Sequence, residues 1–234
     1  MTTNRRNTVR KEKLEGKLIF KSIFFLALIM VITFMGAGRI NYWQGWIYNG
    51  LNLIFLLLSY FLLPRELIEE RLKPKEGMKK WDKIYYIISI PIYFVILIIS
   101  ILDGGRFGWE PQIPILVVII GVVVYTIGQI IILWAKKVNK FFSSVVRIQK
   151  DRDQTVCKYG PYRLVRHPGY LGGLLYIIVT PFVLGSFWGL IPTVIAVILL
   201  FIRTYLEDKT LQNELEGYMD YANEVRYRLL PGIW

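Results

Sequence analysis

The chain has 234 residues, of which 54% are hydrophobic and 15% aromatic, and its formal net charge is +12. Its length would suit one soluble domain, but the apolar residues lie in long blocks that a soluble core does not need. No folded polar module offers a basic face, which excludes nucleic acid as the expected partner.

Four apolar blocks are long enough to cross a bilayer, because about 20 apolar residues span its hydrocarbon core. These blocks are residues 18–37, 43–63, 84–102 and 113–135. A fifth block, residues 169–202, is too long for one span. We expect it to turn near residues 185–189 and form a helical hairpin whose first arm is short, and either tilted or re-entrant. The sequence thus predicts an all-α polytopic membrane protein with about six transmembrane helices.

The basic residues predict the orientation of these spans. Of the 29 lysines and arginines, 27 lie in the N-terminal segment, in alternate loops or in the C-terminal region, and the other two are Arg39 and Arg106. Because basic loops face the cytoplasm, we expect both termini and the loop before residue 169 on the cytoplasmic side. Such basic flanks favour contact with the lipid bilayer.

Composition divides the chain into three regions. Residues 1–16 are polar and basic and are expected to be mobile, and residues 17–135 hold the first four spans. Residues 136–234 contain the polar motifs, the hairpin and a cytosolic C-terminal segment, and form the expected functional core. Gly121 and Gly128 in the fourth span predict close approach of another helix.

Two features argue against particular sites. The chain has one cysteine, Cys157, and one histidine, so neither an intramolecular disulfide nor a structural zinc site is expected, and we predict no metal. The glycine-rich residues 103–108 are not preceded by a strand, so they do not meet the context of a nucleotide-binding fingerprint.

Residues 159–170 form the densest cluster of polar and conformationally special residues, and they include the single histidine, His167. Gly160 and Pro161 predict a turn, and Pro168 suits the first position of a helix. His167 is therefore expected at a helix entrance, where free N–H groups and the helix dipole favour an anion. A histidine that only caps a helix at the membrane interface is the simpler alternative.

A second cluster lies where the last span is expected to leave the membrane. Arg203 and Glu207 are four residues apart, so they share one helix face, and Asp208 follows them. An ordinary helix ion pair would explain this spacing equally well. The chain ends at Trp234, and we expect residues 226–234 to be packed against the protein because a free tail would expose the tryptophan.

These clusters resemble the isoprenylcysteine carboxyl methyltransferase family, one of a wider set of integral-membrane methyltransferases that includes phospholipid N-methyltransferases. The resemblance extends over residues 139–234 and rests on the segment from Gly160 to Tyr170, on Glu207–Asp208 and on the C-terminal residues 218–234. The family pattern usually has a second glutamate at the position of Asp208.

The resemblance implies S-adenosylmethionine bound in a cytosolic pocket and a lipophilic or lipidated acceptor that enters from the bilayer. The cofactor-binding residues that it implies are Gly160, Tyr162, Leu164, Val165, His167, Tyr170, Glu207 and Asp208. Tyrosine rings can face the sulfonium cation, the helix entrance with His167 can take the carboxylate, and Glu207 or Asp208 can take the amino group.

The implied catalytic residues are Arg203 and Glu207. Methyl transfer from a sulfonium is an in-line displacement that mainly requires positioning. A carboxylate acceptor is already ionised at neutral pH, so Arg203 would orient it while Glu207 holds Arg203. An amine acceptor, as in a phospholipid N-methyltransferase, would need a base.

Two further alternatives stay open at this point. An NADPH-dependent membrane reductase of the sterol-reductase type shares the His-Pro-x-Tyr pattern at residues 167–170. A non-enzymatic membrane protein could have kept the same fold.

Overall fold

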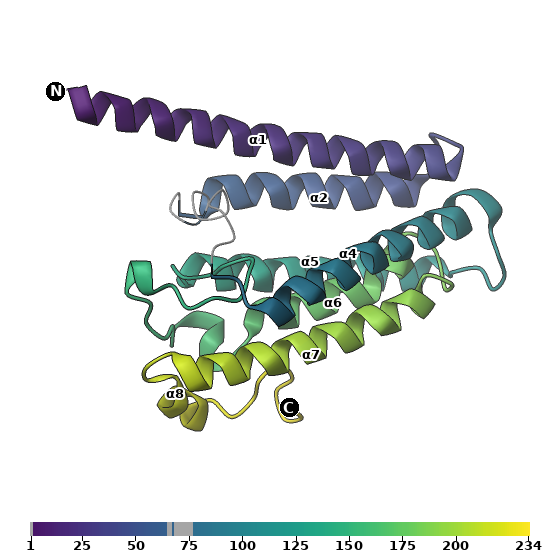
Figure 1. The fold of residues 1–234 in the computed structure, drawn as a ribbon. Helices are drawn as coiled ribbons and strands as arrows, with labels where there is room; N and C mark the ends of the chain where they lie inside the picture. Colours follow the sequence, from purple (N-terminus) through teal and green to yellow (C-terminus); the bar gives the residue numbers. More distant parts are fainter. Residues whose placement is uncertain (1, 65–66, 68–76) are drawn as a thin grey trace.

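The computed structural model describes residues 2–64, 67 and 77–234, and all regular structure in this part of the chain is helical (Figure 1). The main helices are α1 (Thr2–Ala37), α2 (Trp43–Leu62), α4 (Lys80–Ile101), α5 (Ile115–Val138), α6 (Pro168–Val183), α7 (Leu190–Glu214) and α8 (Tyr218–Glu224). A π-helix η1 (Leu102–Phe107) and the 3-10 turns η2 (Lys150–Arg152) and η3 (Gly160–Arg163) complete the described elements. The predicted all-α class is confirmed.

Five helical segments are long and apolar enough to cross a membrane. They are Ile19–Ala37, Trp43–Leu62, Lys80–Phe107, Ile115–Val138 and Leu190–Glu214. Helix α6 has only 16 residues, or about 24 Å at 1.5 Å per residue, which is less than a hydrocarbon core of about 30 Å. The predicted hairpin is therefore present as α6 and α7, with the short first arm that the sequence indicates.

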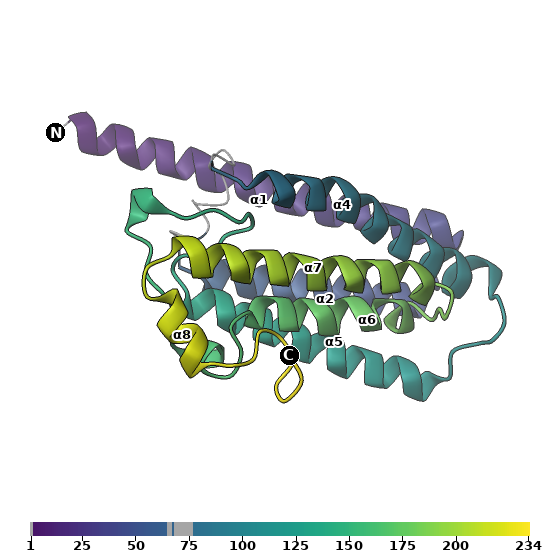
Figure 2. The same cartoon turned by 60° about the horizontal axis from the view of Figure 1, so that its bottom comes forward.

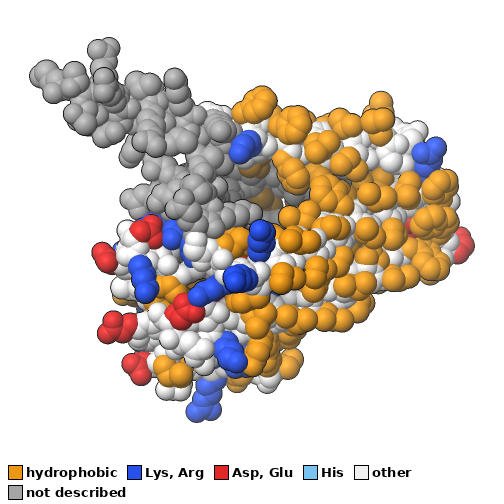
Figure 3. All heavy atoms as spheres, in the orientation of Figure 1, with side chains coloured by type: hydrophobic (Ala, Val, Ile, Leu, Met, Phe, Trp, Pro, Cys, Tyr) orange, Lys and Arg blue, Asp and Glu red, His pale blue; other side chains and the backbone are white. Residues whose placement is uncertain are grey.

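Successive long helices run in opposite directions, which brings the polar segments to one end of the bundle (Figures 1 and 2). This end, called here the motif end, holds the N-terminus, the start of α4, residues 139–167 and α8. The opposite end, called the far end, holds η1 and the turn between α6 and α7. Charged side chains gather at the motif end, whereas hydrophobic side chains cover the helices (Figure 3). The separation agrees with a membrane protein; which end faces the cytoplasm stays a prediction.

Helices α5 and α6 touch backbone to backbone. A Cβ atom on Gly128 would lie 2.7 Å from the carbonyl oxygen of Gly172, and one on Gly172 would lie 2.4 Å from that of Gly128. No side chain fits in these positions, so the close approach predicted for Gly128 is confirmed and its partner is Gly172 on α6. This contact fixes the start of α6, where the histidine motif stands.

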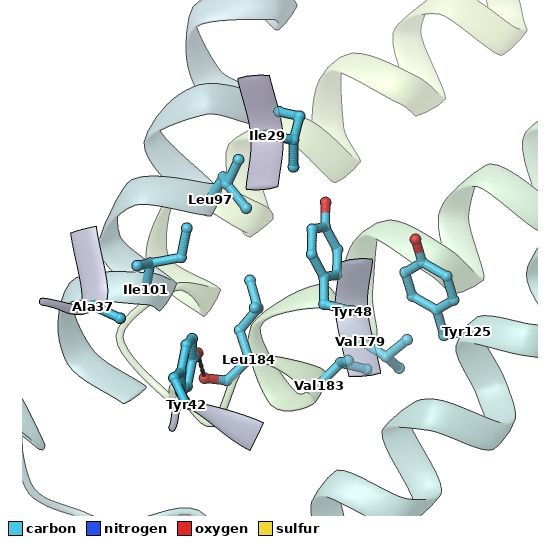
Figure 4. Close-up of a cluster of buried hydrophobic side chains, with 10 residues drawn as sticks. All are labelled: Ile29, Ala37, Tyr42, Tyr48, Leu97, Ile101, Tyr125, Val179, Val183 and Leu184. Carbon is cyan, nitrogen blue, oxygen red and sulfur yellow. Dashed lines mark hydrogen bonds between the residues drawn. The ribbon is translucent and has the colours of Figure 1, made fainter. Parts of the chain in front are cut away.

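A cluster of buried side chains from α1, α2, α4, α5 and α6 packs the interior toward the far end (Figure 4). The Tyr42 hydroxyl donates a hydrogen bond to the carbonyl of Leu184 in the α6–α7 turn. Asp103 in η1 accepts hydrogen bonds from the Ser186 hydroxyl at 2.6 Å and the Trp109 N–H at 2.8 Å. The glycine-rich segment thus forms a π-helix that anchors the hairpin turn.

Candidate active site

The C-terminal segment clamps the histidine motif through the backbone. His167 immediately precedes α6, whose first residue is Pro168, so the predicted helix entrance is confirmed. The N–H of Arg166 donates to the carbonyl of Tyr227 and that of His167 to the carbonyl of Arg228, each at 2.9 Å. These two bonds fix the approach to α6.

The end of the chain is itself held in place, as expected from its tryptophan. The N–H groups of Leu229 and Leu230 each donate to the Trp234 carbonyl at 3.0 Å. The Trp234 ring lies 5.3 Å from that of Phe201 on α7, centroid to centroid. The C-terminal segment is therefore a packed part of the site.

Asp208 on α7 is the centre of the polar network at the motif end, and it is only 1% exposed. Arg166 binds it with both ends of its guanidinium, Nε to Oδ1 at 2.7 Å and Nη2 to Oδ2 at 2.8 Å. Arg228 Nε donates to Oδ2 at 2.8 Å and the Tyr218 hydroxyl to Oδ1 at 3.0 Å. His167 Nε2 lies 3.2 Å from Oδ1. One carboxylate thus joins the motif, α7, α8 and the C-terminal segment.

The partners of Asp208 keep the protonation states that this network needs. Burial and the Asp208 carboxylate raise the pKa of Tyr218, so its hydroxyl stays protonated and donates. Burial alone would lower the pKa of Arg166, but the hydrogen bonds and negative charge of Asp208 raise it. Arg166 and Tyr218 therefore stay protonated and donate hydrogen bonds to the Asp208 carboxylate.

A hollow of about 110 Å³, partly open to solvent, lies beside this network. Its walls include the aromatic rings of Phe142, Tyr162, Tyr170, Tyr218 and Tyr221, and its polar groups include His167 and Glu207. The aromatic rings and the Glu207 carboxylate suit a cationic group of a ligand, while Arg147 and Arg166 line the same hollow and suit an anionic one.

The structure places the eight predicted cofactor residues in two groups. Those that line the hollow are Tyr162, His167, Tyr170 and Glu207. Those outside its lining are Gly160, Leu164, Val165 and Asp208. The Leu164 side chain is 64% exposed and that of Val165 only 1%, while Asp208 is already surrounded by protein donors. Contact of the second group with a cofactor stays a prediction.

Tyr170 connects the two predicted catalytic residues. Its hydroxyl donates to Glu207 Oε2, and its ring centroid lies 5.3 Å from the guanidinium carbon of Arg203. The His167 ring stacks on the Tyr170 ring, with 5.7 Å between the centroids. Instead of the direct Arg203–Glu207 pair that the spacing indicates, an aromatic ring lies between the two residues.

The ion pair of Arg203 is with Asp82 on α4. Arg203 is 8% exposed, and its Nε lies 3.0 Å from Asp82 Oδ1. Its Nη2 donates to the carbonyl of Ser144 at 3.0 Å, and its guanidinium packs against the rings of Tyr85 and Tyr86 at 4.6 and 4.8 Å. Within the described chain, Nη1 has no hydrogen-bond partner, and Arg203 does not line the hollow.

Sequence reasoning missed Asp82 as a site residue. Asp82 Oδ2 also accepts the N–H of Val146 at 2.7 Å, so this acid ties the 139–157 segment to α4. A signal was available, since an acid at the start of an apolar span is costly without a cationic partner. The partner itself, 121 positions away on α7, has no local sequence signature.

The phospholipid methyltransferase family matches residues 116–216, which contain nearly all of α5, the histidine motif, α6 and α7. A search of curated proteins finds no match to the chain. The family consists of integral-membrane methyltransferases and is related to the isoprenylcysteine carboxyl methyltransferases. The resemblance to integral-membrane methyltransferases drawn from the sequence is confirmed over the matched residues.

Proposed function

We propose that this protein uses S-adenosylmethionine to methylate the carboxylate of a membrane-embedded amphiphile. The observation that carries the proposal is the position of Tyr170. Its hydroxyl binds Glu207 inside the hollow and its ring packs against Arg203. Tyr170 therefore contacts both Glu207, the candidate cofactor-binding residue, and Arg203, the candidate acceptor-binding residue.

The residues of the hollow fit the charged groups of S-adenosylmethionine. Glu207 offers a carboxylate for its amino group, and the positive end of the helix dipole at the start of α6 favours its carboxylate. His167 lines the same hollow, and its Nδ1 has no hydrogen-bond partner in the described chain. Tyr170 and Tyr162 present rings to the sulfonium. When bound, the cofactor supplies an electrophilic methyl group.

Contacts with the protein hold the Arg203 side chain in one orientation, which suits it to position an acceptor. Asp82, the Ser144 carbonyl and two tyrosine rings hold its guanidinium, and Nη1 has no hydrogen-bond partner among the described residues. An acceptor carboxylate bound there needs no base, because it is ionised at neutral pH. The residues then contribute mainly by holding two reactants in line.

Residues 136–234 form the proposed methyltransferase core, and the family match adds most of α5 to it. The same match supports a second candidate, N-methylation of a phospholipid amine. That acceptor must lose a proton, and Glu207 is the carboxylate placed to receive it. The match favours both methyl transfers over the nicotinamide-dependent reductase.

The test follows a labelled methyl group from adenosylmethionine to a prenylcysteine analogue and to phosphatidylethanolamine in parallel. We expect a base-labile ester on the first acceptor. Arg203→Lys removes the planar fork and should lower the rate about a hundredfold with little loss of cofactor affinity. Arg106→Lys at the far end is the matched control. A base-stable methylamine formed equally well by Arg203→Lys would establish the phospholipid reaction instead.

A further inference from the structure

The first turns of α4 carry a groove that the proposed reaction does not use. It has about 860 Å³ of empty space and is lined by Met78, Lys80, Lys83, Tyr86, Ile87 and Ile90. None of these residues lines the hollow beside Glu207. The groove is therefore a separate feature of the motif end.

Its residues form one stripe that runs from the motif end into the membrane region. Lys80, Lys83, Ile87 and Ile90 follow one another at spacings of three and four, which places them on one helix face. Lys80 and Ile90 are about 15 Å apart along the axis. All four side chains are exposed. The stripe thus presents two cations at headgroup level and two branched alkyl groups below them.

The two lysines differ from their basic neighbours in forming no ion pair within the described part of the chain. Lys79 binds Glu214 at 2.6 Å, and Arg203 binds Asp82 at 3.0 Å. Neither Lys80 nor Lys83 forms an ion pair with any residue that the structure describes. Two like charges three residues apart on one face repel each other, so an anion between them would be stabilising.

Tyr86 connects the groove with a segment that lines the active-site hollow. Its hydroxyl donates to the carbonyl of Ser144 and lies 3.2 Å from Arg203 Nη2. The next residues, Val145 and Val146, line the hollow. A molecule seated in the groove against Tyr86 would brace the segment that encloses the proposed cofactor.

We propose that this groove binds one anionic phospholipid from the leaflet at the motif end. Its phosphate lies between the ammonium groups of Lys80 and Lys83, and one acyl chain follows Ile87 and Ile90. A zwitterionic lipid binds less well, because its own cation competes with the lysines for the phosphate. Anionic lipids gain affinity from each basic residue near the membrane surface.

The experiment compares phosphatidylglycerol with phosphatidylcholine of identical chains, bound to the purified full chain in detergent and counted by native mass spectrometry. We expect wild type to prefer phosphatidylglycerol about tenfold or more. Lys80→Gln with Lys83→Gln should abolish the preference. Lys150→Gln with Lys209→Gln removes the same charge from two exposed positions outside the groove and should keep it.

Circular dichroism verifies that each variant keeps its helix content. A preference that survives in the Lys80/Lys83 variant, or that falls equally in the control, would overturn the proposal and leave only general electrostatic attraction. Soluble glycerol phosphate is the third arm. If it displaces phosphatidylglycerol at equal concentration, the acyl chain contributes nothing and the lipid assignment is wrong.

Discussion

Two buried aspartates, one at each end of the bundle, are satisfied in different ways. Asp103 at the far end accepts from a serine hydroxyl and a backbone N–H. Asp208 at the motif end accepts from two arginines, a tyrosine and a glutamine, and also contacts His167. Both are nearly inaccessible, at 2% and 1% exposure.

The difference separates a structural carboxylate from one that assembles a site. Asp103 binds neutral donors on neighbouring segments and secures one turn. Asp208 binds the guanidinium groups of Arg166 and Arg228, which belong to two segments far apart in the sequence. Removal of the carboxylate should therefore have much larger consequences at the motif end than at the far end, since it leaves the buried guanidinium of Arg166 without its anionic partner.

Asp208→Asn should have the largest effect. Arg166 and Arg228 lose their common partner, and breaking a buried pair from one side costs about 3–5 kcal/mol. We expect a large fall in the thermal unfolding midpoint and loss of adenosylmethionine binding. Differential scanning fluorimetry and calorimetric titration in detergent measure the two. A variant that unfolds like wild type would show that the network does not hold the motif end together.

Glu207→Gln should reduce cofactor binding without affecting the fold. Glu207 lines the hollow and, in the described chain, its carboxylate hydrogen-bonds to Tyr170. Loss of one charge-assisted bond to a ligand costs about 1.5–3 kcal/mol, or about 10–150-fold in affinity. Calorimetry of adenosylmethionine binding checks this value, and His167→Ala should weaken binding through the same ligand. Wild-type affinity in both variants would remove the two residues from the site.

Asp103→Asn tests the buried carboxylate at the far end. An asparagine keeps one oxygen acceptor, so we expect to lose only one hydrogen bond, about 1 kcal/mol of unfolding free energy. Adenosylmethionine affinity should stay at the wild-type value because η1 lies at the far end. A loss of binding as large as that of Glu207→Gln would mean that the two ends are coupled.

The smallest effect concerns Cys157, which lines the hollow. Burial raises the pKa of its thiol, and the thiolate is the reactive form. Maleimide labelling should therefore be slow at neutral pH, accelerate as the pH rises through the raised pKa, and slow down when adenosylmethionine is present. In sealed right-side-out vesicles, labelling before permeabilisation would refute the predicted cytoplasmic position of the motif end.

The sequence predicts the spans because apolar length and charge asymmetry are properties of each segment. It also places His167 at a helix entrance, since Pro168 acts locally. The pairing of Arg203 with Asp82, and of Arg166 and Arg228 with one carboxylate, depends on how the helices are packed. Spacing therefore suggests Glu207 as the partner of Arg203, whereas Tyr170 takes the position between them.

The shortness of α6 determines how deep the chemistry occurs. Its C-terminal end meets the α6–α7 turn at the far end, so a helix of about 24 Å starts below the opposite surface of a core about 30 Å thick. We therefore expect His167 to lie below the membrane surface at the motif end. In the proposed reaction a soluble cofactor would descend to this level, and an amphiphilic acceptor would reach it by lateral diffusion within the bilayer.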